Sequence, residues 1–138
     1  MDRLFGPLGL DHVVLHVRDQ EVSRRFYTDI LGCTLDHVNA KFSLVQLRFG
    51  QNLIDLLPLD PAAPAPRPEG GMDHLCLSIR CNDLQKVAED LKARGVTVEG
   101  DVVKRRGAFG EGPSLYLRDP DGYRIELKPR SGPSEARS

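Results

Sequence analysis

The strongest constraint in this chain of 138 residues is an internal repeat. A histidine that follows an aspartate opens an apolar segment at His12, and the same pair of residues opens a second segment at His74. A carboxylate closes each copy, Asp55 in the sequence IDLLP and Glu126 in the sequence IELKP. Such self-similarity indicates two copies of one supersecondary unit. Copies that each supply a histidine and a carboxylate predict a metal site where they meet.

Composition limits the class of protein. A hydrophobic fraction of 40%, a charged fraction of 28% and a net charge of -1 are ordinary for a soluble globular protein. Basic residues are scattered, so no nucleic-acid partner is expected, and no apolar run is long enough to span a membrane. The first residues lack the apolar region of a signal peptide. The three cysteines show no CxxC spacing, which predicts a reduced, cytoplasmic protein.

The first half of the chain, residues 8–59, predicts one helix between strands. Residues 8–17 form an apolar segment that predicts a strand buried on both faces, with His12 and His16 on the same face. Asp19 is suited to cap a helix over residues 20–31, and Gly32 is suited to end it. Strands are predicted over residues 33–38, 42–49 and 52–57.

The second half, residues 72–129, repeats this pattern. The proline-rich residues 60–71 predict a linker before it, and the small, polar residues 131–138 predict a flexible tail. A helix is expected from Asn82 or Asp83 to Gly95. Strands are predicted over residues 72–79, 96–98, 102–105, 113–117 and 123–128. The chain is therefore predicted to be a single α+β domain over residues 1–138, built of two βαβββ modules.

The second copy is longer than the first because of a glycine-rich stretch at residues 105–112. Glycine-rich loops beside a site often move, so this stretch is predicted to be a flexible lid. Ser114 and Tyr116 follow it, two residues apart on one face of a strand. They are either contacts for substrate oxygens or ordinary strand residues.

The repeated residues permit metal chemistry. Imidazole and carboxylate together suit Fe, Mn, Ni, Co or Zn as divalent ions, and two histidines with one or two carboxylates leave positions open for water or substrate. Other interpretations remain open for single residues. Glu126 and Asp55 could belong to a solvated outer strand face, because alternation alone does not decide which face is the site. His16 is either a pocket residue that carries protons or a surface residue.

Several motifs together resemble the vicinal oxygen chelate superfamily, which includes glyoxalase I, fosfomycin-resistance thiol transferases, extradiol dioxygenases and bleomycin-binding proteins. The motifs are LDHV at residues 10–13, FYTDILG at 26–32, DHL at 73–75 and DPDGYRIE at 119–126. The resemblance implies paired βαβββ modules, each curling into an open half-barrel around a metal cavity. It implies His12, His74 and Glu126 as metal ligands, with Asp55 at a fourth ligand position where glyoxalase I has Glu.

These observations lead to a functional hypothesis. The chain is predicted to be a cytoplasmic enzyme with one divalent metal ion (Zn, Ni, Mn or Fe), a lyase or isomerase resembling lactoylglutathione lyase. Asp55 and Glu126 are the predicted catalytic residues, and Asp55 is either a fourth ligand or the base. The predicted substrate-binding residues are Ser114, Tyr116 and His16. The resemblance also implies a homodimer that acts on a small molecule. The alternatives are a fosfomycin-type thiol transferase and a non-catalytic module that sequesters small molecules.

Overall fold

The computed structural model describes residues 4, 6–60, 62 and 70–130 of the chain. The chain divides into two compact units, residues 1–66 and residues 67–138, which are described one at a time. The predicted tail, residues 131–138, and most of the predicted linker, residues 60–71, lie outside the described residues. No helix among the described residues is long and apolar enough to cross a membrane.

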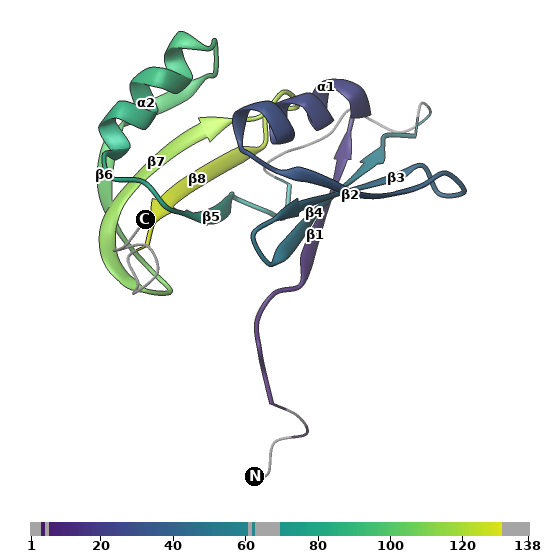
Figure 1. Cartoon of the computed structure of the whole chain (residues 1–138), viewed down its shortest axis with the longest axis horizontal. Helices are drawn as coiled ribbons and strands as arrows, with labels where there is room; N and C mark the ends of the chain where they lie inside the picture. The colour runs from purple at the N-terminus through teal and green to yellow at the C-terminus, as the bar shows by residue number, and fades with distance from the viewer. Residues whose placement is uncertain (1–3, 5, 61, 63–69, 131–138) are drawn as a thin grey trace. The chain divides into compact units, whose positions relative to one another are not determined.

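The first module forms a four-stranded mixed sheet in the order β1-β4-β3-β2, in which β1 runs parallel to β4 and the other pairs are antiparallel (Figure 1). Its helical segments follow β1 in the chain, and α1 contacts β3 and β4. The elements are β1 (His12–Val17), α1 (Gln20–Arg25), η1 (Phe26–Ile30), β2 (Thr34–Asn39), β3 (Leu44–Phe49) and β4 (Asn52–Pro58).

The strand β1 differs from its prediction in length and burial. It begins at His12 rather than at residue 8. Leu15 and Val17 are buried, but Val14, on the same face as His12, is 44% exposed. The prediction of burial on both faces is therefore wrong: one face packs in the core and the other stays open, as alternation in a half-buried strand produces.

The helix of the first module begins where the sequence predicted. The Asp19 carboxylate accepts hydrogen bonds from the backbone N–H groups of Glu21 and Val22, which would otherwise lack partners. After α1 the chain widens into a π-helical turn, η1, which was not predicted. Gly32 follows with a φ of 80°, the left-handed conformation that glycine adopts at a helix end.

The second module repeats the topology, with a mixed sheet in the order β5-β8-β7-β6 and β5 parallel to β8. Asp83 caps its helix by accepting from the backbone N–H of Lys86. The elements are β5 (Leu75–Ile79), α2 (Leu84–Ala93), β6 (Val98–Gly107), β7 (Gly110–Arg118) and β8 (Arg124–Pro129). The prediction of an α+β fold made of two βαβββ modules is confirmed.

The glycine-rich stretch of the second module is an ordered hairpin. Strand β6 continues through the two short strands that were predicted, with a register shift between Glu99 and Val103. It then pairs with β7 up to Gly107, which lies opposite Gly110. The predicted loop at residues 105–112 is therefore mostly paired strand, because the backbone groups of its two arms satisfy each other.

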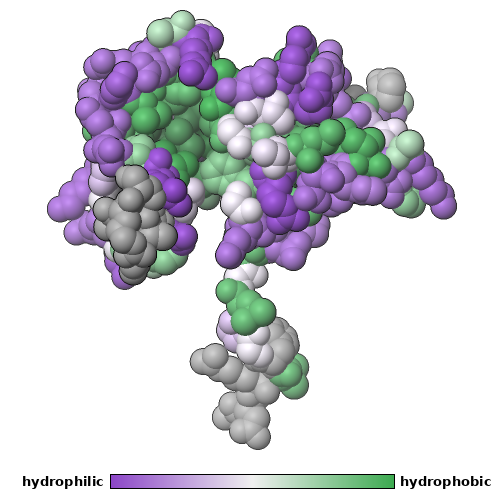
Figure 2. Space-filling model, in the orientation of Figure 1, coloured by the Kyte–Doolittle hydropathy of each residue, from purple (hydrophilic) through white to green (hydrophobic). Residues whose placement is uncertain are grey.

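Equivalent residues form the two hydrophobic cores. Leu47 lies opposite Ile54 in the first sheet, and Leu117 lies opposite Ile125 in the second. All four are at most 2% exposed. In the second module, hydrophobic residues gather over β7 and β8 beside α2, whose outer surface is hydrophilic (Figure 2). The open face of each sheet remains for the polar residues that the repeat singled out.

Candidate metal and substrate site

Strand register brings the histidine and the carboxylate of the first module together. Asp55 in β4 lies opposite Val14 in β1, so it shares a face with His12, two residues earlier. His12 Nε2 lies 4.0 Å from Asp55 Oδ2. The His12 side chain is 44% exposed, whereas the Asp55 side chain is 3% exposed. The pair therefore joins an accessible imidazole to a buried carboxylate.

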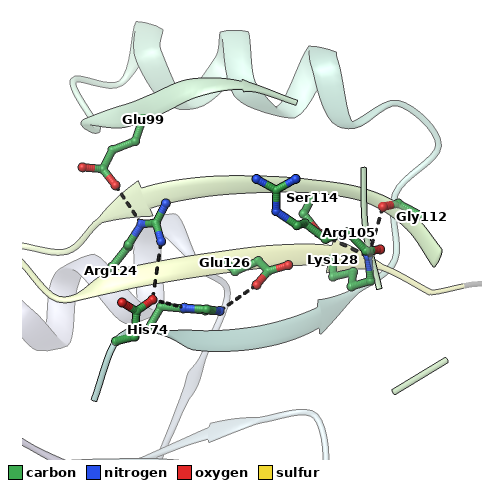
Figure 3. A network of polar contacts seen from close by, with 9 residues as sticks. His74, Glu99, Arg105, Gly112, Ser114, Arg124, Glu126 and Lys128 are labelled. Carbon is green, nitrogen blue, oxygen red and sulfur yellow. Dashed lines mark hydrogen bonds and ion pairs between the residues drawn. The ribbon is translucent and has the colours of Figure 1, made fainter. Parts of the chain in front are cut away.

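The second module contains the equivalent pair at closer range. Glu126 in β8 lies opposite Cys76 in β5, and His74 precedes Cys76 by two residues on the same face. His74 Nε2 lies 2.9 Å from Glu126 Oε1 (Figure 3). The longer glutamate side chain reaches hydrogen-bond distance, whereas the aspartate of the first module stops at 4.0 Å.

A second carboxylate holds each imidazole from its other nitrogen. His12 Nδ1 lies 2.7 Å from Asp11 Oδ1, and His74 Nδ1 lies 2.6 Å from Asp73 Oδ2. The hydrogen bond with Asp11 raises the pKa of His12, and the hydrogen bond with His74 lowers the pKa of Asp73. A carboxylate at this nitrogen leaves Nε2 as the ligand atom and fixes the plane of the ring.

The sequence prediction missed both of these carboxylates. Alternation placed Asp11 on the face opposite His12, and no role was expected for Asp73. Both residues precede the first residue of their strand, so their side chains reach the neighbouring ring despite that alternation. The available signal was the repeat itself, since the pair Asp-His occurs at the start of both copies.

Asp55 has an oxygen that suits a cation. Its Oδ2 accepts a hydrogen bond of 3.1 Å from Gln46 Nε2. Its Oδ1 is buried and has no hydrogen-bond partner among the described residues. A buried carboxylate oxygen without a donor is costly, and coordination of a metal ion would satisfy it.

Glu126 is held as a carboxylate. Burial raises its pKa, but hydrogen bonds from Ser114 and Tyr116 and the nearby charge of His74 outweigh this effect and lower the pKa overall. Ser114 is fully buried and Tyr116 is 7% exposed. The two hydroxyls predicted to contact substrate therefore contact Glu126 in this structure.

Charged residues extend the network outward from Tyr116 and Asp73. The Arg124 guanidinium lies 3.9 Å from the centre of the Tyr116 ring and 3.6 Å from Asp73 Oδ2. Its Nε also donates to Glu99 Oε1 at 3.0 Å (Figure 3). Arg124 therefore contacts both of the groups that position His74 and Glu126, the aspartate and the tyrosine.

A cavity of about 630 Å³ lies entirely within the second module. Its wall includes His74, Cys76 and Glu126, the β6–β7 hairpin and the end of β8. Partial desolvation, with the nearby charge of Glu126, raises the pKa of the Cys76 thiol to about 11. Ser114, Tyr116 and His16 are not among the residues that line the cavity; His16, in β1 of the first module, is exposed.

The donor set fits a divalent metal ion. Among the described residues, no three His, Cys, Asp or Glu side chains gather closely enough to hold a metal. Each module instead offers one imidazole and one buried carboxylate. Such nitrogen and oxygen donors suit Zn, Ni, Mn or Fe, and the Asp55 oxygen without a hydrogen-bond partner is free to bind such an ion.

Both modules have the βαβββ fold, and both carry a histidine and a carboxylate at equivalent positions. Comparison with known proteins identifies the class of protein that has these features. The sequence profile of the Glyoxalase/Bleomycin resistance protein/Dioxygenase superfamily matches residues 9–127. The chain belongs to this superfamily.

Two relatives and one solved structure show how the chain compares within the superfamily. It is 35% identical to virulence protein STM3117 of Salmonella typhimurium over 86% of this chain and 81% of that protein. It is 28% identical to a probable lactoylglutathione lyase of Synechocystis, over 84% of this chain and 91% of that protein. The structure of integron cassette protein VCH_CASS1 of V. cholerae matches with a TM-score of 0.75 and 32% identity, covering 94% of this chain and 100% of that one.

Proposed function

We propose that the chain is a divalent-metal-dependent enzyme, a lyase or isomerase that binds a small substrate through two neighbouring oxygens. One observation carries the proposal. Each module places a histidine and a buried carboxylate at the same register, and each histidine has an aspartate on Nδ1. A histidine whose second ring nitrogen is held by a carboxylate is typical of metal ligands, and this arrangement occurs in both modules.

In this proposal His12, His74 and Glu126 are the metal ligands, and Asp55 is a fourth ligand or the catalytic base. The metal, when bound, stabilises negative charge that develops on a substrate oxygen. Asp11 and Asp73 hold the imidazoles with Nε2 outward. Asp55 has one oxygen occupied by Gln46 and one oxygen able to accept a proton or a cation.

Ser114 and Tyr116 support the proposed role of Glu126. Their hydroxyls hydrogen-bond to the Glu126 carboxylate and help to keep it ionised, which a metal ligand requires. The two residues are therefore proposed to act through Glu126, whereas His16, which is exposed on the same strand face as His12, is proposed to contact substrate. The proposal places the enzyme in the cytoplasm as a homodimer. The likeness to a protein named as a probable lactoylglutathione lyase supports the lyase or isomerase class.

Metal analysis tests this proposal directly. Protein purified without chelator is expected to contain one equivalent of Zn, Ni, Mn or Fe by mass spectrometry, and its thermal midpoint should rise when metal is restored after chelation. His74→Ala should abolish both effects. His37→Ala is the matched control, because His37 is exposed on β2 and belongs to neither pair.

The same measurements can refute the proposal. A metal-free chain whose melting does not respond to any of the four metals would support a non-catalytic binding module instead. Metal occupancy that survives His74→Ala would show that the ligand set is wrong.

A further inference from the structure

The buried ammonium group of Lys128 uses all of its protons within the second module. Lys128 is 8% exposed and lies two residues beyond Glu126 in β8. Its Nζ donates to the backbone oxygen of Arg105 at 2.6 Å, to that of Gly112 at 3.1 Å and to Ser114 Oγ at 3.3 Å. An ammonium group has three protons, so these three hydrogen bonds leave no donor for a ligand. The group is therefore part of the framework that surrounds Glu126.

Lys128 determines the direction in which the Ser114 hydroxyl donates. Ser114 is fully buried, and its Oγ accepts the hydrogen bond from Lys128. A hydroxyl has a single proton, and an ammonium group has no lone pair that could accept it. The proton is instead donated to Glu126, and this hydrogen bond helps to lower the pKa of Glu126. The hydrogen bonds therefore run in one direction, from Lys128 to Ser114 and from Ser114 to the Glu126 carboxylate.

Strand register places these groups on one face of the sheet. Tyr116 in β7 lies opposite Glu126 in β8. Ser114 precedes Tyr116 by two residues and Lys128 follows Glu126 by two, so all four side chains share this face. Lys128 and Glu126 also belong to the wall of the cavity, and Figure 3 shows them as neighbours along β8. The lysine is thus close to the carboxylate without being paired with it directly.

The same lysine holds both arms of the β6–β7 hairpin. Arg105 and Gly112 lie opposite each other in β6 and β7, and their backbone oxygens accept from the same Nζ. The pairing of β7 with β8 involves residues 115–118 of β7, so this part of the hairpin lies beyond it. Gly107 permits the close approach, because a Cβ there would be 2.9 Å from Lys128 Cδ and Cε. Lys128 therefore connects the hairpin wall of the cavity to β8.

We propose that Lys128 is a positioning residue that acts on Glu126 through Ser114 and that joins the hairpin wall of the cavity to Glu126 as one unit. The Ser114 proton stays on the carboxylate because Lys128 already donates to the hydroxyl oxygen. A ligand that moves the hairpin would therefore also change the hydrogen bonding of Glu126. The importance of this arrangement for metal binding rests on the proposed function, in which Glu126 is a ligand.

The first test observes the Glu126 carboxylate by NMR in full-length, metal-free protein that carries carbon-13 at Cδ of glutamate. Glu126→Gln assigns the signal, because it removes the labelled carboxylate. Ser114→Ala should shift this signal, and Lys128→Met should shift it in the same direction, since the hydroxyl can then turn away from Glu126. In Ser114→Ala protein, Lys128→Met should cause less than half of the shift that it causes alone.

Two outcomes of this test would overturn the proposal. Equal shifts on Lys128→Met with and without the Ser114 hydroxyl would show that the lysine acts on Glu126 directly through its charge. No shift on Ser114→Ala would show that the hydroxyl does not influence the carboxylate.

Two glycines of the hairpin provide matched variants that keep the lysine and remain useful if Lys128→Met does not fold. Gly107→Ala places a methyl group against Lys128 Cδ and Cε and should displace the ammonium group. At Gly112 a Cβ would lie 4.0 Å from Lys128 Nζ, which is an ordinary contact. Neither glycine has the positive φ that would strain an alanine. Gly107→Ala should therefore shift the Glu126 signal and Gly112→Ala should not, and equal shifts would contradict the proposal.

Hydrogen exchange in metal-free protein tests the connection to the hairpin. Lys128→Met should make the amides of residues 105–112 exchange about tenfold faster, whereas those of α2 should keep their rates. Lys104→Met is the control, because Lys104 lies on the same hairpin with a side chain that is 74% exposed. Equal acceleration in α2, or none in the hairpin, would refute the connection. Since both methods use metal-free protein, a chain that binds no metal would refute the proposed function while these results still decide the role of Lys128.

Discussion

The two modules share a fold and a pair of residues, yet they surround that pair differently. In the first module His12 and Asp55 stand 4.0 Å apart, and Gln46 is opposite the carboxylate. In the second module His74 and Glu126 are 2.9 Å apart, and Tyr116 is opposite the carboxylate. Duplication has kept the donor atoms and changed the groups that hold them.

The contrast continues along the strand that carries each carboxylate. Two residues before the carboxylate, Leu53 in the first module corresponds to Arg124 in the second, and two residues after it Leu57 corresponds to Lys128. The second module thus gains two cations on the strand that also bounds its cavity. The difference teaches that the module with the tighter pair also lines the cavity of about 630 Å³.

The largest expected effect tests how alike the two cores are. Leu47→Ala and Leu117→Ala remove fully buried side chains at the same register position. Each should lower the free energy of unfolding by about 2–5 kcal/mol, because a cavity replaces packed atoms. Urea unfolding followed by circular dichroism measures both. A loss below about 1 kcal/mol at either site would show that the cores are not equivalent.

The two buried carboxylates should respond differently to loss of charge. Glu126→Gln should destabilise the metal-free protein by about 1.5–3 kcal/mol, because hydrogen bonds to a charged group are lost. Asp55→Asn should cost less than about 1 kcal/mol, since one of its oxygens has no partner to lose. Thermal unfolding after chelation compares them. Equal losses would mean that Asp55 has stabilising contacts equal to those of Glu126.

The orienting aspartates give the next comparison. Asp73→Asn should weaken metal binding about tenfold, because it loosens the ring of His74. Asp11→Asn should weaken metal binding by the same factor or a smaller one, because Asp73 is also held by Arg124. Competition with a chelating dye gives both dissociation constants. If neither variant differs from the unaltered protein, the aspartates do not orient metal ligands.

The smallest effect concerns ion pairs at equivalent strand positions. The hydrogen bond from Arg118, with one from Arg124, lowers the pKa of Glu99 below its usual 4.5. A lowered folded-state pKa adds stability above about pH 4.5, which is lost as the pH falls through the folded value.

Glu99→Gln should therefore remove a few tenths to about 1 kcal/mol at pH 7, and the difference from the unaltered protein should shrink as the medium becomes acidic. Asp36→Asn removes the corresponding single pair with Arg48, which lies at 3.0 Å in the first module. Asp36→Asn should lower the free energy of unfolding by less than Glu99→Gln does. Thermal melts at pH 7 and pH 3.5 give both values, and a larger loss for Asp36→Asn would contradict the prediction.

The repeat in the sequence predicted much of this arrangement. The repeat singled out His12, Asp55, His74 and Glu126 at equivalent positions, but alternation left open which strand face they occupy. The parallel pairing of β1 with β4 and of β5 with β8 is what brings each histidine to the carboxylate of its own module. The helix caps at Asp19 and Asp83 could also be predicted from the sequence, because each depends on hydrogen bonds between residues close together in the chain.

Other features depend on contacts that local patterns do not encode. Lys128 was predicted only as the last residue of the strand at 123–128, and its burial arises when β6 and β7 fold over β8. The ordered hairpin was not predicted for the same reason. Its glycines suggest mobility, and the close approach of Lys128 to Gly107 is known only from the structure. The π-helical turn at Phe26–Ile30 likewise has no pattern in the sequence that we recognised.

The cavity described above lies within one copy of the repeat. Whatever the pairing of the modules, within one chain or between two chains, the residues that line this cavity stay together with His74 and Glu126. Substitutions in one copy can therefore change which molecule is accepted without altering the metal donors of the other copy.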